Sequence, residues 1–303
     1  MAPRLRPFIV APESPAGFPR LVRDVFEAQV ALARRGISPG SIDAAPGSQT
    51  RKAISVFQEF QNLSQTGLLD TNTRVRLKLA APLMTTYVVT TNDLARLQPL
   101  GKTWLAKSQQ SALEYETELE LVAEKSHSHP ELIRRLNLGV NWTNIAAGTV
   151  LHIPDLDYPA ASNKAAFAVI HLADKFLEAF DTETNLLAHF PCSIAANVEK
   201  RPVGELHVAV VAPNPNYTFD PDLFPESPEA QQLNQKLILP PGPNNPVGVA
   251  WIGLDKTGYG IHGTPVPEQV GRTESHGCFR LANWDAEYLS KLVWVGMPVL
   301  VQP

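Results

Sequence analysis

A chain of 303 residues is longer than one ordinary domain, so two or three domains are expected. Its formal net charge of -4 and the lack of a basic run give no electrostatic reason to expect nucleic acid as a partner. No segment approaches the ~20 uninterrupted apolar residues that a membrane span needs. Two cysteines, Cys192 and Cys278, are too few for a disulfide framework or a four-cysteine zinc site.

Residues 1–19 are expected to be an extended lead-in. Five prolines interrupt the segment, and no apolar stretch follows Arg4 and Arg6 as it would in a signal peptide. If the protein is exported, its signal sequence is therefore expected to have been removed from this chain.

Residues 20–80 are expected to form a small helical domain. Apolar residues recur at three- and four-residue offsets over residues 22–33, which is the spacing of one helix face. A second helix is expected around Phe57, and Asp70 or Thr71 could cap a third.

Residues 81–155 predict a second, mixed module. One helix is expected over residues 117–125 and another from Pro130 to Asn137, followed by a strand over residues 150–153. The first part of this module shows no clear pattern. Residues 156–164 are expected to be a linker.

The pattern changes to β-structure from residue 165 to the end of the chain at residue 303. Short alternating runs predict strands, including one that ends at His262, and a helix follows Asn283 or Asp285. Residues 213–246 are rich in proline and asparagine. This stretch is too long for an ordinary connection, and such segments are often lids or binding loops.

Three reactive groups lie close together in the sequence: His262, His276 and Cys278. A thiol attacks as the thiolate, so it needs a lowered pKa or a nearby base. His262 could reach Cys278 through a folded loop, and His276 could share a strand face with it. The N–H groups around Gly277 and Cys278 are candidate oxyanion donors, and Arg280 could favour a thiolate or hold a substrate carboxylate.

Two other interpretations of these residues stay open at this point. Cys278 could be a buried structural cysteine flanked by hydrogen-bonded histidines. Alternatively, His262, His276 and Cys278 could bind a metal ion, although no fourth ligand is evident. Cys192 lies on a predicted strand and is expected in the core. No metal or cofactor is expected.

The run Ile261-His262-Gly263-Thr264, followed by Ser275-His276-Gly277-Cys278-Phe279-Arg280-Leu281, resembles the signature of the L,D-transpeptidase (YkuD-like) catalytic domain. Asn283-Trp284-Asp285 also fits, and so does Arg201-Pro202-Val203-Gly204, with arginine where threonine is usual. The resemblance covers residues 165–303. It implies a multidomain α+β protein whose C-terminal domain is mainly β and sandwich-like.

The resemblance also implies roles for single residues. Cys278 would be the acylated nucleophile and His262 the general base, oriented by the carbonyl of Gly263. His276 and Gly277 would help to form the oxyanion site, with Arg280 supporting the pocket. The candidate substrate-binding residues are Ser275, Tyr259, Tyr217 and Phe219.

The implied substrate is the peptidoglycan stem peptide of a bacterial periplasm or cell wall. The enzyme would cut the L,D amide of a tetrapeptide, release D-alanine and pass the acyl group to an amine. The acceptor would be a second stem, giving a 3→3 cross-link, or an envelope protein, and carbapenems would react with the cysteine. Two alternatives remain: an L,D-carboxypeptidase or amidase that uses water, and a wall-binding protein without activity.

The front half of the chain fits the same resemblance. Residues 20–80 are similar to peptidoglycan-binding domains of the three-helix type, at positions that include Asp43, Gly47 and Thr50. Residues 81–155 resemble a LysM module with βααβ order, most clearly over residues 147–154. Glycan and stem peptides are the expected partners of these modules, although either could serve as a spacer.

Overall fold

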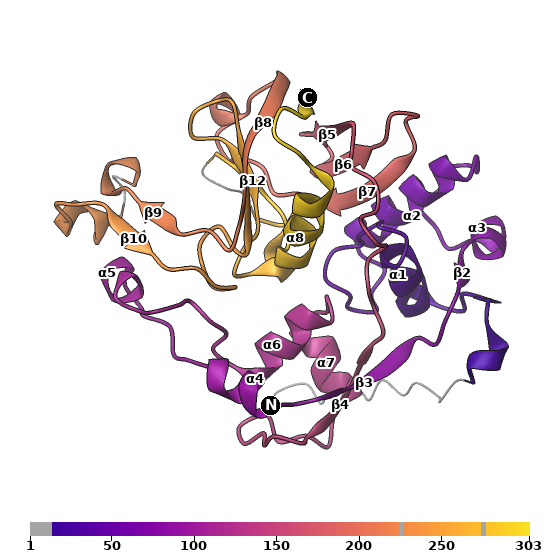
Figure 1. Cartoon of the computed structure of the whole chain (residues 1–303). Coiled ribbons are helices and arrows are strands. Elements are labelled where there is room, and N and C mark those ends of the chain that lie inside the picture. The colour runs from indigo at the N-terminus through magenta and orange to yellow at the C-terminus, as the bar shows by residue number, and fades with distance from the viewer. Residues whose placement is uncertain (1–13, 225–226, 274–276) are drawn as a thin grey trace.

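The computed structural model describes residues 14–224, 227–273 and 277–303. Ser275 and His276, two of the predicted site residues, lie outside the described residues. Three units follow one another along the chain and pack together (Figure 1). They are called here the N-terminal unit (residues 20–79), the central module (residues 84–154) and the C-terminal unit (residues 165–303).

Three helices build the N-terminal unit, as the apolar spacing predicts. These are α1 (Val25–Ala33), α2 (Ser48–Phe60) and α3 (Thr71–Arg76). The antiparallel strands β1 (Arg20–Leu21) and β2 (Lys78–Leu79) close the unit at its two ends. Asp70 caps α3 by accepting a hydrogen bond from the Thr73 amide, which decides between the two expected caps.

The central module is a two-stranded antiparallel sheet with helices between its strands. Strand β3 (Met84–Val88) pairs with β4 (Val150–Pro154). The helices are α4 (Thr91–Arg96), α5 (Trp104–Ser108), α6 (Glu118–Lys125) and α7 (Pro130–Leu136). Leu121 and Ile133 from α6 and α7 pack in one apolar cluster with Leu151 of β4, so both long helices cover the sheet.

An eight-stranded sheet forms the C-terminal unit, in the order β13-β12-β11-β8-β14-β5-β6-β7. The strands are β5 (Phe167–His171), β6 (Phe176–Phe180), β7 (Leu186–Pro191), β8 (Gly204–Pro213), β11 (Ala250–Leu254), β12 (Gly260–His262), β13 (Phe279–Arg280) and β14 (Pro298–Gln302). The pairs β12–β13 and β14–β5 are parallel, and the other neighbouring pairs are antiparallel.

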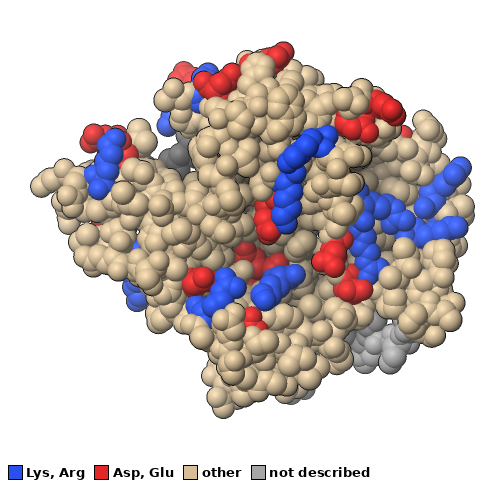
Figure 2. All heavy atoms as spheres, viewed as in Figure 1, with Lys and Arg blue, Asp and Glu red and all other residues tan. Residues whose placement is uncertain are grey.

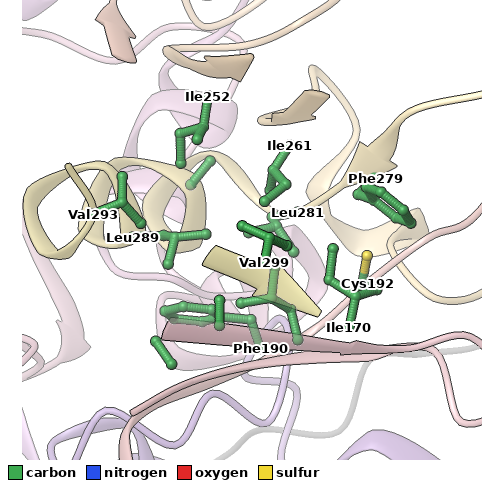
Figure 3. Close-up of a cluster of buried hydrophobic side chains, with 14 of the residues drawn as sticks. Ile170, Phe190, Cys192, Ile252, Ile261, Phe279, Leu281, Leu289, Val293 and Val299 are labelled. Atoms are coloured by element: carbon green, nitrogen blue, oxygen red, sulfur yellow. The ribbon is translucent and has the colours of Figure 1, made fainter. Parts of the chain in front are cut away.

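The sheet curls around one apolar cluster. Ile170 and Phe190 come from β5 and β7, whereas Ile252 and Ile261 come from β11 and β12 near the other edge, and all four share the cluster (Figure 3). Helix α8 (Asn283–Leu292) contributes Leu289 and contacts β8, β11 and β12. The mixed helix-and-sheet class expected from the sequence is therefore confirmed.

Strands β9 (Tyr217–Phe219) and β10 (Leu237–Leu239) pair outside the large sheet. With their flanking residues, 214–224 and 227–246, they make an arm that reaches toward α5 of the central module (Figure 1). Short 3-10 helices lie in the connections: η1 (Pro15–Gly17), η2 (Val198–Lys200), η3 (Pro221–Leu223), η4 (Ala230–Gln232) and η5 (Pro267–Gln269).

Contacts between the units fix their relative positions. Ile37 of the N-terminal unit pairs with His189 on the edge strand β7, and the Ser38 amide donates to the His189 carbonyl at 2.8 Å. The ring of His127, which follows α6, stacks on Trp284 of α8 with 5.2 Å between centroids. On the face drawn in Figure 2, acidic and basic side chains are interspersed, in keeping with the small net charge.

Candidate active site

His262 ends strand β12 and is almost fully buried. Its Nδ1 lies 2.6 Å from the carbonyl oxygen of Gly263, and its ring stacks on Trp251 of the neighbouring strand β11. A carbonyl oxygen can only accept, so Nδ1 carries the hydrogen and Nε2 is left as the basic nitrogen. Burial lowers the pKa of His262 to about 4, and the nearby charge of Arg280 acts in the same direction. The ring is therefore neutral at pH 7.

Cys278 precedes strand β13, which runs parallel to β12. In that pairing Ile261 lies opposite Phe279 and His262 opposite Arg280, so Cys278, just before β13, lies beside the strand that ends at His262. The Cys278 Sγ donates to the Gly258 carbonyl at 3.5 Å. Burial raises the pKa of Cys278, while the Arg280 guanidinium lowers it. A thiol with a raised pKa needs a base to become a nucleophile.

Cys192 has a different environment. It is fully buried in the apolar cluster of the sheet, beside Ile170 and Phe279 (Figure 3). Burial raises its pKa to about 12. Within the described residues, Cys192 and Cys278 are not joined in a disulfide. Cys192 is therefore a core residue, as its place on a strand predicts.

The other predicted site residues are distributed unevenly around Cys278. A Cβ built on Gly277 would meet open space, so the backbone there is accessible. Tyr217 lies close enough to Cys278 for the thiolate charge to raise its pKa, although burial is the larger cause of its shift to about 12. Tyr259 packs against the sheet cluster, under the Lys256 ammonium. Phe219 is fully buried inside the arm, so it packs the arm and does not face open space.

Residues 165–301 match the family model of the L,D-transpeptidase catalytic domain, YkuD. The chain carries an L,D-transpeptidase catalytic domain. A second family model, described provisionally as a peptidoglycan binding domain, matches residues 23–77. The predicted resemblance to both families is thereby confirmed.

The curated relatives of this chain have names that assign them provisionally as L,D-transpeptidases. YqjB of Bacillus subtilis is 37% identical over 105 residues, which is 33% of this chain and 51% of that protein. YkuD of Bacillus licheniformis is 24% identical over 186 residues, 61% of this chain and 93% of that protein. YbiS of Escherichia coli K12 is 30% identical over 165 residues, 54% of this chain and 53% of that protein. The alignments thus span about half the length of YqjB and YbiS.

Solved structures to which the chain is similar include L,D-transpeptidase 3 of Mycobacterium tuberculosis. It is 18% identical, with a TM-score of 0.36, and the match covers 53% of this chain and 77% of that chain. An L,D-transpeptidase of Enterococcus faecium is 15% identical, with a TM-score of 0.35, over 48% of this chain and 57% of that chain.

Asn283 of this L,D-transpeptidase domain has a position that the sequence does not predict. It was expected to cap α8, but it is the first residue of that helix, and the cap position belongs to Ala282. Its side chain turns instead toward the backbone around Gly263, where Oδ1 accepts from the Thr264 amide at 3.0 Å. A Cβ on Gly263 would lie 2.2 Å from that oxygen, so this position needs glycine. The asparagine in the signature run was a signal for this role.

Neither a metal cluster nor a membrane span is found in the described part of the chain. No group of three His, Cys, Asp or Glu side chains there could hold a metal ion. The alternative metal set includes His276, which lies outside the described residues. Among the described residues, no helix is both long and apolar enough to cross a bilayer.

Proposed function

We propose that this chain is a peptidoglycan L,D-transpeptidase with Cys278 as its nucleophile. The support is the coincidence of two observations. The L,D-transpeptidase family model covers residues 165–301. Within that range His262 ends β12, Cys278 immediately precedes the parallel strand β13, and the Nδ1 of His262 is bound to a carbonyl. The substrate is the L,D amide of a stem tetrapeptide.

Proton transfer between the two side chains starts the reaction. Nε2 of His262 takes the thiol proton as the Cys278 sulfur attacks the amide carbonyl. The imidazolium then gives that proton to the departing nitrogen, so D-alanine leaves as a neutral amine and a thioester remains. The amine of a second stem attacks the thioester, His262 accepts its proton, and the returning thiolate regains a proton from the imidazolium. Each cycle therefore leaves the enzyme unchanged.

Charge on the tetrahedral intermediates must be met by hydrogen-bond donors. The N–H groups at Gly277 and Cys278 are the proposed donors, with His276 beside them. Arg280 lies opposite His262 in the strand register, and its charge favours the thiolate over the thiol. The same charge disfavours the imidazolium of His262. We therefore assign Arg280 to the nucleophile and to the developing negative charge.

A thioester that must react with an amine needs protection from water. The arm is the proposed cover, because its residue Tyr217 is near Cys278. Tyr217, Tyr259 and Ser275 are the proposed contacts for the stem peptide. Phe219 is buried, so its proposed role is to stabilise the arm by packing.

The two N-terminal parts are proposed to bind the same polymer. Residues 23–77 match the peptidoglycan-binding family model. The LysM assignment of the central module is supported by the antiparallel pairing of β3 with β4 and by α6 and α7 between them, although α4 and α5 also lie between β3 and α6. Two weak wall-binding modules on one chain would raise the local concentration of substrate at Cys278. We accordingly propose the periplasm or cell wall as its location, with stems or an envelope protein as acyl acceptors.

Purified disaccharide-tetrapeptides and product mass spectrometry test this function. The wild-type protein is expected to form 3→3 dimers with loss of one D-alanine, and the Cys278→Ala variant none. Trimmed tripeptides without dimers would identify water as the acceptor and support a carboxypeptidase. If neither product forms and imipenem adds no mass to Cys278, the result would support a wall-binding protein without activity.

A further inference from the structure

One carboxylate of the central module reaches into the catalytic domain. Glu124, on helix α6, accepts a hydrogen bond at Oε1 from Nδ2 of Asn283, the first residue of α8. The two residues are separated by 159 positions in the chain. The bond therefore joins two units of the fold, and it does so next to the loop that follows His262.

Asn283 uses its other atoms to hold that loop. Its Oδ1 accepts from the amides of Thr264, at 3.0 Å, and Val249, at 3.3 Å. Its Nδ2 also donates to the Pro243 carbonyl at 3.0 Å. The orientation of the side-chain amide is thus assigned. Its oxygen lies toward the loop after His262, and its nitrogen lies toward Glu124 and Pro243. Reversing the amide would break all of these bonds at once.

The loop held in this way carries the acceptor for the catalytic histidine. The carbonyl of Gly263 lies between His262, whose Nδ1 it binds at 2.6 Å, and Thr264, whose amide is fixed by Asn283. The orientation of an imidazole depends on the partner of its other nitrogen. A series of hydrogen bonds and covalent neighbours therefore runs from Glu124 through Asn283 and the loop to His262.

Helix α6 is seated firmly enough to act as an anchor. Glu120, one turn before Glu124, accepts from Nδ2 of Asn244 at 2.5 Å, and the Asn244 amide donates to the Leu113 carbonyl at 2.9 Å. Helices α6 and α8 are in contact. A cavity of about 390 Å³ lies beside Glu124 and is lined by Asn244, Val266 and Glu268 among others. Because the side chain borders this cavity, its removal leaves space that water can fill without collapse of a packed core.

We propose that Glu124 and Asn283 are positioning residues for the acyl-transfer reaction, so that docking of the central module orients His262. The proposal rests on the proposed function of Cys278 and His262. It gives the module a second task besides wall binding: a module that moves away from α8 releases Asn283, and the histidine loses its fixed orientation toward the thiol.

The full chain and imipenem acylation of Cys278, followed by intact mass, provide the test. Glu124→Ala is expected to slow acylation about tenfold, since displacement of a reacting group by a fraction of an ångström has effects of this size or larger. Glu124→Gln keeps the acceptor oxygen and should stay within about twofold of the wild type. Glu118→Ala, on the same helix, is the matched control and should leave the rate unchanged.

Exchanging the donor and the acceptor of the Glu124–Asn283 hydrogen bond shows whether a variant loses activity through mispositioning or through lower stability. At a pH above the pKa of Glu124, about 8, that side chain is ionised. There Asn283→Asp keeps the oxygen for Thr264 but places a carboxylate opposite a carboxylate, so acylation should slow. Adding Glu124→Gln returns a donor to the pair, and the double variant should recover part of the rate. Melting temperatures measured in parallel show whether each variant is folded.

The outcomes distinguish this inference from the proposed function. A folded Glu124→Ala variant that is acylated at the wild-type rate overturns the positioning role. So does a Glu124→Gln variant as slow as Glu124→Ala, or a double variant no faster than Asn283→Asp. If the wild type itself is not acylated, the proposed function fails. The rate of iodoacetamide alkylation at Cys278 near neutral pH then still tests the positioning role, because a displaced His262 can no longer accept the thiol proton and alkylation should slow.

Discussion

The Nδ1–H of His262 donates to the carbonyl of Gly263 at 2.6 Å, so a single backbone oxygen sets the tautomer of the buried imidazole. Serine and cysteine hydrolases often use a carboxylate for this purpose. A carbonyl carries no full charge, so it stabilises an imidazolium less than a carboxylate would. The lowered pKa of His262, about 4, is consistent with that arrangement.

Replacing His262 should therefore remove the base without disturbing the thiol. For His262→Ala we expect the rate of Cys278 acylation by imipenem to fall by roughly 10²- to 10⁴-fold, the usual contribution of a positioned general base. Cys192→Ala is the control, because that cysteine is in the core. It should lower stability modestly and leave the acylation rate within about twofold. Comparable losses in both variants would argue against His262 as the base.

The reactive residues of the proposed site could be selected from the sequence alone. His262, Gly263, Cys278 and Arg280 stand in one ordered signature, and in the structure His262 lies opposite Arg280, with Gly263 and Cys278 next to these two strands. Glu124 could not be found in that way. It occupies an ordinary position on an amphipathic helix, and its partner lies 159 residues away, so its importance depends on how two units dock.

Contacts between distant parts of the chain also explain why the structure of the arm and of the central module differs from the sequence-based expectation. Phe219 was expected near the substrate because it lies in a long loop with aromatic residues. Its ring instead stacks on Trp104 of α5, with 4.4 Å between centroids. No local pattern in residues 97–116 predicts that contact. Strand β3 was similarly undefined until its pairing with β4 completed the module.

Trp104 should control how well the arm shields the thioester. Its ring lies within the cluster formed by Phe219, Phe224 and Tyr217. Trp104→Ala removes a stacked pair that contributes about 1 kcal/mol beyond its buried area. We expect faster proteolysis within the arm and a larger share of hydrolysed product relative to cross-linked dimer. Trp294→Ala, at a partly exposed residue outside this cluster, should change neither measurement.

The stability of the protein should decrease between pH 6.5 and pH 8. Burial raises the pKa of Glu124 to about 8 and that of Asp285 to about 7. A carboxyl whose pKa is higher in the folded state binds its proton more tightly there, so its contribution is present at low pH and is lost as pH rises toward that value. The buried His127 and His262 have lowered pKa values, about 3 and 4, and their effect is already complete above pH 6.5.

Urea unfolding at several pH values measures this effect. Across the window, Glu124 should account for a loss of about 1–2 kcal/mol in the free energy of unfolding. Glu124→Gln cannot ionise, so its stability should fall less steeply with pH than that of the wild type. A variant with the same slope as the wild type would show that Glu124 titrates below the window.

Asp285 should be required for docking of the N-terminal unit. It is fully buried and accepts hydrogen bonds from Ser38 Oγ, at 3.2 Å, and from the hydroxyl of Tyr158. Asp285→Ala leaves both donors without their acceptor in a buried place, which costs about 1–3 kcal/mol for each unsatisfied group. Asp285→Asn keeps one acceptor oxygen and should cost less. The free energy of unfolding from urea titration measures both variants.

A double variant tests whether the hydrogen bonds of Asp285 join the units of the fold. Removing one donor as well, in Asp285→Ala with Tyr158→Phe, leaves a single unsatisfied hydroxyl, that of Ser38. The double variant should then be no less stable than Asp285→Ala alone, because one penalty is gone. Fully additive losses would mean that the Tyr158 hydroxyl stabilises the protein through a partner other than Asp285, because phenylalanine keeps the ring that stacks on Tyr288. In that case Asp285 would not be what joins the units.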